Sequence, residues 1–247
     1  MVVGGSGGIG SQLVTSLSSN NEVFAVGRDE EKLNNLKNKL NCKNVRVLTM
    51  DVSRVDQIKK LFKVTERLDV LINCAAVLSP IGLFLDNKLS DWKKNIEINL
   101  LGTVNCCYYA LPLLLESERG KIINFGGGGA AYGRAGHTAY ASSKTAVVRF
   151  TETLATEYPT VDINVIAPGA YKTKMWNDET FEKGPESWGD METLKEFIGF
   201  LVSDKSDGLT GRFLHYKDDW KNMNGKKLKD FMFTLRRIDN FMFTKKR

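Results

Sequence analysis

The feature that most restricts the fold of this chain is a glycine-rich segment near its N-terminus. A short apolar run, Met1–Val3, leads into Gly-Gly-Ser-Gly-Gly-Ile-Gly and then into an apolar pattern at helical spacing. A strand, a glycine turn and a helix in this order let the backbone approach a pyrophosphate, which the free N–H groups of the helix N-terminus bind. Three residues are short for a central buried strand, which leaves open whether Met1 is the true start. We predict dinucleotide contacts from Gly4, Ser6, Gly7, Gly8, Ile9 and Gly10.

The end of the second predicted strand, Glu22–Val26, bears on which dinucleotide binds. An acidic residue at this point binds the ribose hydroxyls of NAD, whereas an arginine accommodates the 2′-phosphate of NADP. Here the strand runs into Gly27 and Arg28, and Asp29 follows where it is expected to cap the next helix. Arg28 therefore favours NADP, with NAD as the alternative.

Strands and helices alternate through the N-terminal half of the chain. We predict helices over Glu30–Leu40 and around Gln57–Lys63, and strands over Val45–Met50 and Leu68–Ile72. This alternation predicts an α/β fold with a single doubly wound, Rossmann-type parallel sheet covered by helices on both faces, and 247 residues suit one such domain. Ligands bind beyond the carboxyl ends of such strands, where Gly4, Arg28, Asp51 and Asn73 fall.

Tyr140 and Lys144 stand four residues apart in a segment that opens a predicted helix, so both side chains lie on one helix face. A phenol has a reference pKa of about 10, and a nearby ammonium lowers this pKa because it favours the phenolate. The pair is a candidate acid–base centre near neutral pH. A half-buried tyrosine beside a solvated lysine is the alternative for this spacing alone.

The positive charge of the chain is concentrated at its C-terminus. Residues 221–247 carry a net charge of +7, whereas the preceding 220 residues carry −1. Basic tails bind nucleic acid or acidic lipid, but this tail also contains many large apolar residues, which do not stay solvated in a loose arm. We therefore predict a domain over residues 1–220 and an extension over 221–247 that packs on the domain or on a partner subunit, with neither a nucleic-acid nor a membrane partner.

The cysteines and histidines do not suggest a metal or disulfide framework. Cys42, Cys74, Cys106 and Cys107 lack the spacing of metal ligands or of disulfide scaffolds. His137 and His215 have no acidic or thiol partner at metal-ligand spacing, so we expect packing or surface roles for both. No apolar run has the length needed to cross a bilayer. We expect a cytoplasmic protein with reduced thiols and no metal.

In combination, these motifs resemble those of the short-chain dehydrogenase/reductase family over nearly the whole chain. The resemblance implies that Tyr140 exchanges a proton with the substrate oxygen, that Lys144 holds the nicotinamide ribose and lowers the pKa of Tyr140, and that Asn99 positions a water behind the lysine. The matching positions are Gly4, Gly8 and Gly10 in the glycine loop, Asp51 and Val52 at the adenine, Asn73 and Ala75 after the fourth strand, Asn99, Tyr140 and Lys144, and Pro168, Gly169 and Thr173 over the nicotinamide.

One position departs from the family pattern. The family carries a serine thirteen residues before the tyrosine, where it hydrogen-bonds the substrate oxygen, and here that position is Gly127 in a run of four glycines. Loss of such a donor costs about 10²–10³ in rate when nothing replaces it. A backbone N–H of the glycine run, a side chain such as His137 or Thr138, or loss of carbonyl reduction would each explain the change. We favour the first, because glycines after a strand expose N–H groups to a ligand.

Two further segments have expected roles. Residues 171–190 are polar and contain Gly and Pro, which predicts a mobile lid over the substrate. The predicted helices Trp92–Leu115 and Tyr140–Tyr158 are apolar on more than one side. In the family these helices form the dimer face, so the resemblance implies a homodimer or homotetramer.

The resulting hypothesis is an NADP(H)-dependent oxidoreductase that transfers a hydride between nicotinamide and a small-molecule carbonyl or secondary alcohol. The glycine run and the C-terminal pattern are similar to a branch of the family met in sugar-nucleotide and surface-polysaccharide pathways. The alternative, suggested by Gly127, is a catalytically weak nucleotide-binding protein that serves as a sensor or subunit.

Overall fold

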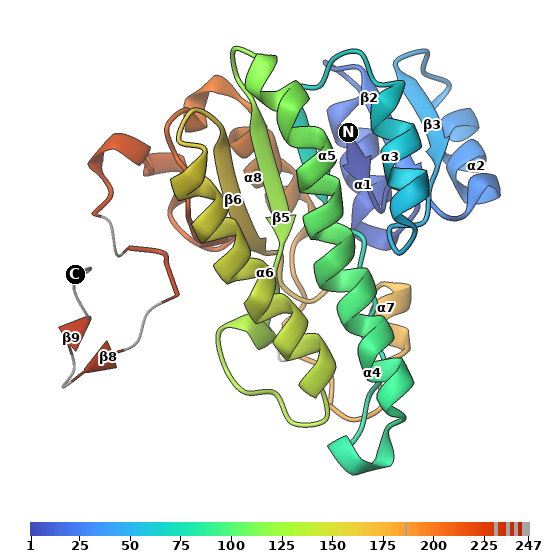
Figure 1. Cartoon of the computed structure of the whole chain (residues 1–247), viewed down its shortest axis with the longest axis vertical. Coiled ribbons are helices and arrows are strands. Elements are labelled where there is room, and N and C mark those ends of the chain that lie inside the picture. Colours follow the sequence, from blue (N-terminus) through green and yellow to red (C-terminus); the bar gives the residue numbers. More distant parts are fainter. Residues whose placement is uncertain (186, 230–231, 236–237, 240–241, 244–247) are drawn as a thin grey trace.

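The computed structural model describes residues 1–185, 187–229, 232–235, 238–239 and 242–243, and its centre is a seven-stranded parallel sheet (Figure 1). The strand order is β3-β2-β1-β4-β5-β6-β7, so the chain crosses from one half of the sheet to the other between β3 and β4. The predicted doubly wound Rossmann-type sheet is confirmed. The strands are β1 (Val2–Val3), β2 (Val23–Gly27), β3 (Val45–Thr49), β4 (Val70–Asn73), β5 (Lys121–Phe125), β6 (Asp162–Ala167) and β7 (Phe213–His215).

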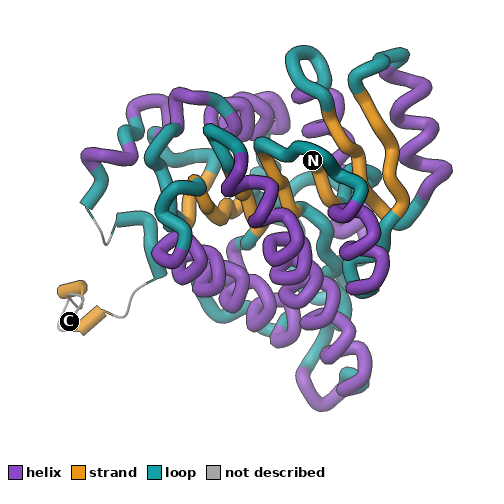
Figure 2. The backbone as a smooth tube through the Cα atoms, turned by 45° about the horizontal axis from the view of Figure 1, so that its top comes forward, coloured by secondary structure: helices purple, strands orange, loops and turns teal. Residues whose placement is uncertain are grey.

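Helices cover both faces of the sheet (Figures 1 and 2). One layer consists of α1 (Gly8–Leu17), α2 (Glu30–Leu40) and α8 (Met191–Val202), and the other of α3 (Val55–Lys63), α5 (Gly102–Glu116) and α6 (Thr138–Glu157). Successive strand residues supply the two resulting cores alternately: Ile72 and Ile123 pack with α1 and α8, whereas Leu71 and Ile122 pack with α3 and α5. Apolar residues at consecutive strand positions are therefore needed, because neither face meets solvent.

The long helix of the second layer is nearly continuous from α4 (Leu89–Ile96) through a π-helical turn (Glu97–Leu101) into α5. By length and composition alone this helix could cross a membrane, which corrects the expectation that no segment would reach that length. Half of its apolar window is buried within the protein. Cys106, Ala110 and Leu114 are fully covered in the core with α3 and the sheet, which accounts for the apolar composition of the helix.

The first part of the C-terminal extension lies along the edge of the sheet at β7. The backbone N–H of Phe213 donates to the carbonyl of Phe233 at 2.6 Å, and the guanidinium of Arg212 donates to the carbonyl of Met232 at 3.0 Å. Leu235 packs beside Val147 and Val148 of α6. These contacts cover an edge strand whose N–H groups would otherwise be open. The prediction that the extension docks also concerned residues 230–231, 236–237, 240–241 and 244–247, which lie outside the described part of the chain.

Candidate active site

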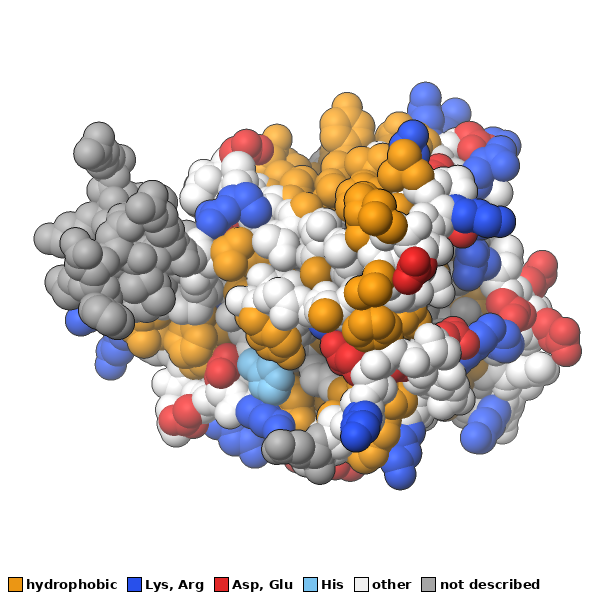
Figure 3. Space-filling view, turned by 90° about the horizontal axis from the view of Figure 1, so that it is seen from below, with side chains coloured by type: hydrophobic (Ala, Val, Ile, Leu, Met, Phe, Trp, Pro, Cys, Tyr) orange, Lys and Arg blue, Asp and Glu red, His pale blue; other side chains and the backbone are white. Residues whose placement is uncertain are grey.

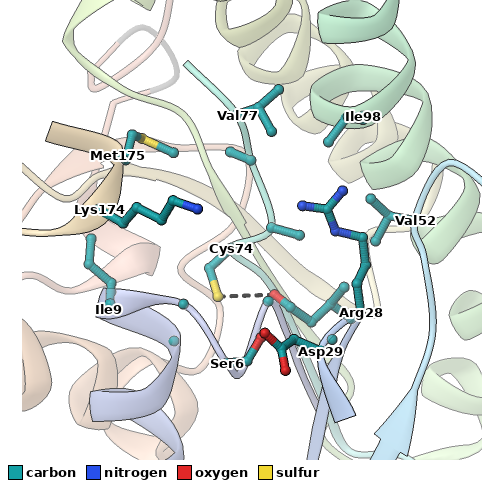
Figure 4. Close-up of a pocket in the computed structure, with 18 of the residues that line it drawn as sticks. Ser6, Ile9, Arg28, Asp29, Val52, Cys74, Val77, Ile98, Lys174 and Met175 are labelled. Atoms are coloured by element: carbon teal, nitrogen blue, oxygen red, sulfur yellow. Dashed lines mark hydrogen bonds between the residues drawn. The ribbon is translucent and has the colours of Figure 1, made fainter. Parts of the chain in front are cut away.

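A cavity of about 450 Å³ opens at the carboxyl ends of β1 to β4 (Figure 4). Its walls come from the glycine loop, the ends of β2, β3 and β4, Ile98 of the π-helical turn, and the segment after β6. Many residues predicted to contact a cofactor meet here although they are far apart in the sequence. These are Gly4, Ser6, Gly7, Gly8, Ile9, Gly10, Arg28, Asp51, Val52, Ala75 and Thr173.

The glycines of the loop allow contacts that a side chain would block. Gly4 has a φ of +91°, and a Cβ atom there would lie 2.6 Å from the backbone nitrogen of Ala75. A Cβ on Gly8 would lie 2.5 Å from Cγ2 of Thr173, and one on Gly10 would overlap the carbonyl oxygen of Gly4. The loop is thus held tightly between β4 and the segment after β6, with the N-terminus of α1 facing the cavity. This cradle fits the phosphates of a dinucleotide.

Arg28 and Asp29 have separate roles at the end of β2. Asp29 caps α2 by accepting from the backbone N–H of Lys32 at 3.0 Å, and it also pairs with the ammonium of Lys32 at 2.6 Å. The hydrogen bond from Lys32 lowers the pKa of Asp29 below its ordinary value. Arg28 is exposed, lines the cavity, and has no ion-pair partner among the described residues. Figure 4 shows its guanidinium directed into the cavity, where it could bind a 2′-phosphate.

Lys144 and Tyr140 lie one turn apart on α6, as their spacing predicted. The Lys144 ammonium donates to the carbonyl of Phe125 at the end of β5 at 2.7 Å and lies 5.9 Å from the centre of the Tyr140 ring. Burial lowers the pKa of Lys144 to about 8, and a charge interaction with Cys74 partly opposes this. Cys74 lines the cavity, so the charge of Lys144 acts on a wall residue, although neither Lys144 nor Tyr140 itself lines the cavity.

The pKa of Tyr140 shifts in the direction opposite to the one expected from the sequence. Burial raises this pKa, and the charge of Arg134 only partly opposes the shift. The neighbouring ammonium of Lys144 is directed at a backbone carbonyl, so removal of water from the phenol dominates. Tyr140 therefore keeps its proton at neutral pH, as a proton donor must.

The glycine run after β5 borders the hydroxyl of Tyr140. A Cβ atom on Gly127 would lie 2.9 Å from this hydroxyl oxygen. No described residue accepts a hydrogen bond from the backbone N–H of Gly127, Gly128 or Gly129. These N–H groups are therefore available to a bound oxyanion.

Of the two side chains considered as replacements for the serine, His137 has both ring nitrogens engaged, whereas the hydroxyl of Thr138 only accepts a hydrogen bond. His137 is fully buried, with Nε2 at 2.7 Å from a carboxylate oxygen of Glu179 and Nδ1 at 2.7 Å from the carbonyl of Ala135. The hydroxyl of Thr138 accepts from the indole N–H of Trp92 at 3.2 Å. Because this hydroxyl only accepts within the described part of the chain, its own O–H proton is still free to donate, and Thr138 stays an alternative to the backbone N–H groups.

Asn99 and Asn73 are both buried, and their side chains are hydrogen-bonded within the protein. The Asn99 side chain accepts from the backbone N–H of Val77 at 2.8 Å and donates to the hydroxyl of Ser143 at 3.1 Å, so it ties the exit of β4 to α6. Asn73 donates to the side chain of Asn124 at 2.9 Å within the sheet. Neither side chain lines the cavity. Their predicted contacts with a water and with the cofactor stay predictions.

Only part of the segment after β6 lines the cavity. Pro168 is buried, and Gly169, with a φ of +85°, lies against Tyr216, so neither lines the cavity. Thr173 does, and it is followed by the short helix α7 (Lys174–Asn177). Lys174 and Met175 also line the cavity, although the sequence analysis did not single them out.

The predicted lid, residues 171–190, is fastened to the N-terminus of α6 by a buried ionic cluster. Glu179, whose side chain is 1% exposed, contacts Nε2 of His137 and the guanidinium of Arg134 at 2.7 and 2.8 Å. Arg134 also pairs with Glu182 at 2.8 Å. The expected packing role of His137 thus includes a specific carboxylate partner 42 residues away. No local sequence signal could have identified this pair, because it depends on how the lid folds back.

No metal site accompanies these groups: within the described residues, His, Cys, Asp and Glu side chains nowhere gather in threes at ligand distance.

Comparison with known proteins gives a consistent assignment. The short chain dehydrogenase family profile matches residues 1–183. The 3-oxoacyl-(acyl-carrier-protein) reductase FabG of Rickettsia bellii is 30% identical over 226 residues, covering 87% of this chain and 93% of that enzyme. A short chain dehydrogenase of Escherichia coli CFT073, solved in complex with NADPH, superposes with a TM-score of 0.82 at 25% identity over 87% of this chain and 95% of the other. ElxO with NADP bound gives a TM-score of 0.77 at 28% identity, with 87% and 94% coverage. The chain therefore belongs to the short-chain dehydrogenase family.

Proposed function

We propose that this protein is an NADP(H)-dependent reductase that interconverts a carbonyl and a secondary alcohol. The observation that carries the proposal is the position of Tyr140 and Lys144. The protonated phenol and the buried ammonium lie together on α6, 5.9 Å apart from ring centre to nitrogen, and the charge of Lys144 interacts with Cys74 in the wall of the glycine-lined cavity. A bound nicotinamide would supply or accept the hydride at the substrate carbon.

The preference for NADP over NAD rests on Arg28. Its cation lines the cavity unpaired, whereas the neighbouring carboxylate of Asp29 is used by α2 and Lys32. NAD-specific binding would need an acidic group free to bind the ribose hydroxyls. The related structures bound to NADP or NADPH support the same choice.

The residues of this chain would act on the substrate as follows. Tyr140 would donate the proton from its hydroxyl to the carbonyl oxygen as the hydride reaches the carbon. Lys144 would balance the negative charge left on the phenol. The N–H groups of Gly127 and its neighbours would bind the developing oxyanion in place of the absent serine.

For the substrate, the relatives suggest 3-oxoacyl thioesters as the first class to test, because they are named as reductases of 3-oxoacyl groups on acyl carrier protein. Apolar side chains gather on the face of the molecule seen from below (Figure 3). The segment before α4 exposes Leu83, Phe84 and Leu85, and α4 begins with the exposed Leu89. Such a surface suits an acyl chain better than a sugar. A sugar-nucleotide substrate stays in the proposal as the second class.

We further propose a homodimer or homotetramer in the cytoplasm. Leu101, Tyr108 and Leu115 are 48%, 71% and 46% exposed at seven-residue spacing along the long helix, and so form an apolar stripe on one side of it. Such a stripe is suited to burial against a second subunit.

The test is a substrate panel combined with cofactor titration. Oxidation of NADPH and of NADH would be followed with 3-oxoacyl thioesters, simple ketones and keto-sugar nucleotides, while calorimetry measures the binding of both cofactors. The proposal predicts tighter binding of NADPH and turnover with at least one carbonyl class. Binding without turnover of any class would support the second candidate, a catalytically weak nucleotide-binding protein, for which the missing serine at Gly127 is the motivating observation.

A further inference from the structure

The cavity contains a second cation without a partner, on the side opposite Arg28. Lys174 is the first residue of α7, lines the cavity, and takes part in no ion pair with any residue that the structure describes. In Figure 4, Arg28 enters from the end of β2 and Lys174 from the lid, and both charged groups are directed toward the middle of the cavity. Two cations facing one another across a cavity suit a ligand with more than one anionic group.

The local structure places Lys174 next to the glycine loop. Thr173, which precedes it, touches this loop, since a Cβ atom on Gly8 would lie 2.5 Å from its Cγ2 atom. The carbonyl of Thr173 accepts from the N–H groups of Trp176 and Asn177 at 3.0 Å each, so the helical turn begins directly at Lys174. Its side chain therefore leaves the lid beside the N-terminal turn of α1.

The carboxylates of the cavity do not neutralise Lys174. Asp29 is paired with Lys32, and Asp51 accepts hydrogen bonds from the N–H and hydroxyl of Ser53 at 2.9 and 2.8 Å. Asp178, one turn after Lys174, also lines the cavity but is not within ion-pair distance of it. The charge of Lys174 is thus available to a ligand.

We propose that Lys174 binds the diphosphate bridge of the dinucleotide, so that the cofactor connects the lid to the glycine loop. This inference rests on the proposed function. The diphosphate is favoured over the 2′-phosphate because Lys174 lies beside the N-terminus of α1, whereas Arg28 lies at the strand end where the ribose is recognised. The two cations consequently bind different anionic groups of the cofactor: Arg28 distinguishes NADPH from NADH, and Lys174 binds both alike.

The separate contributions of Arg28 and Lys174 to affinity can be measured by calorimetry with three ligands. These are NADPH, NADH and adenosine 2′-phosphate, which lacks the diphosphate. Lys174→Met should lower the affinities for NADPH and for NADH by the same factor, about tenfold, and should leave the affinity for adenosine 2′-phosphate unchanged. Arg28→Ala should lower the affinities for NADPH and for adenosine 2′-phosphate and should leave the affinity for NADH unchanged. Lys172→Met is the matched control, because Lys172 lies two residues away, stacks on Trp188 and does not line the cavity.

Two further measurements check the electrostatic origin of the effect. Lys174→Arg should restore most of the affinity lost in Lys174→Met. Raising the ionic strength should reduce the difference in dinucleotide affinity between wild type and Lys174→Met, because salt screens an exposed charge contact.

The outcomes separate this inference from the proposed function. If the wild-type protein binds NADPH and Lys174→Met changes neither dinucleotide affinity, the role of Lys174 is refuted while the function stands. If Lys174→Met lowers the affinity for NADPH but not for NADH, Lys174 is a second contact to the 2′-phosphate, and the inference is also wrong. If the wild-type protein binds neither dinucleotide, the proposed function itself fails.

Discussion

The hydroxyl of Tyr140 occupies the space next to Gly127 that a side chain would need: a Cβ atom on Gly127 would lie 2.9 Å from the phenolic oxygen. There is no room for a side chain between them unless one of them moves. The missing serine is therefore part of how this site is packed, because the tyrosine occupies the space that a side chain at position 127 would need.

Restoring the serine should not raise activity. In Gly127→Ser the new Cβ would displace the Tyr140 hydroxyl from its position, so we expect kcat to stay level or fall, with NADPH affinity unchanged. Gly133→Ser is the control, since a Cβ there meets no atom within 4 Å. A rise of tenfold or more in kcat, which corresponds to about 1.4 kcal/mol of transition-state stabilisation, would show that the glycine run does not supply the missing donor.

The pH dependence of catalysis should reflect Lys144. Its pKa is lowered to about 8, so the ammonium is present below this pH and is lost as the pH rises through it. Tyr140, whose pKa is raised, stays protonated over the same range. We expect kcat/KM for carbonyl reduction, which reports the free enzyme, to be level near pH 7 and to fall above about pH 8. A profile that stays level to pH 10 would contradict this assignment, and Lys144→Arg, which cannot deprotonate in this range, should remove the fall.

The buried lid cluster should depend on the charge of Glu179. Burial acts to raise the pKa of Glu179, but hydrogen bonds from the N–H groups of Phe181 and Glu182 and from His137 outweigh it, so the pKa is lowered. The ionised carboxylate therefore stabilises the packing of residues 171–190 against the N-terminal end of α6 above the ordinary pKa of 4.5, and this contribution is lost as the pH falls through the lowered value.

Replacing this carboxylate should loosen the lid at neutral pH. Glu179→Gln removes the buried carboxylate that contacts His137 and Arg134, while Arg134 keeps its pair with Glu182, and we expect a loss of about 2 kcal/mol, or roughly 4–8 °C in Tm. Proteolysis within residues 171–190 should become faster. Glu182→Gln, which removes a more exposed partner of Arg134, should have a smaller effect. Equal effects of the two substitutions would rule out a special role for Glu179.

The C-terminal extension should be structural. Ending the chain after Trp220 removes the backbone acceptors used by Arg212 and Phe213 and the packing of Leu235, so we expect a loss of about 3 kcal/mol, or roughly 6–12 °C in Tm. Ending the chain after Leu235 retains these contacts and should preserve the melting temperature. Unchanged stability of the shorter protein, together with weaker binding to nucleic acid or acidic vesicles, would instead indicate a binding tail.

Much of the fold follows from sequence periodicity and local signals. The helix predicted over Glu30–Leu40 has these limits in the structure, and its cap is Asp29, as expected. The strands at Val45 and Leu68 lie where predicted to within two residues. These elements were predictable because propensity, capping and burial on both faces of the sheet all favour the same structure.

The parts that sequence could not predict depend on tertiary contacts. The pair of His137 and Glu179 forms only when the lid folds back on α6, and no spacing rule connects residues so far apart. The pKa of Tyr140 depends on its burial and on the direction of the Lys144 side chain, which spacing alone does not give. Lys174 stands in no motif, and it is identified as a cavity residue only once Thr173 is seen against the glycine loop.

The most direct test of the account is the turnover of Tyr140→Phe with the carbonyl substrate identified by the panel. This substitution keeps the ring and its packing and removes the phenolic proton. We predict that kcat falls by at least about 10²-fold, the low end for a general acid, while calorimetry shows unchanged affinity for NADPH. Retained turnover in Tyr140→Phe would show that another group donates the proton and would contradict the assignment of this site.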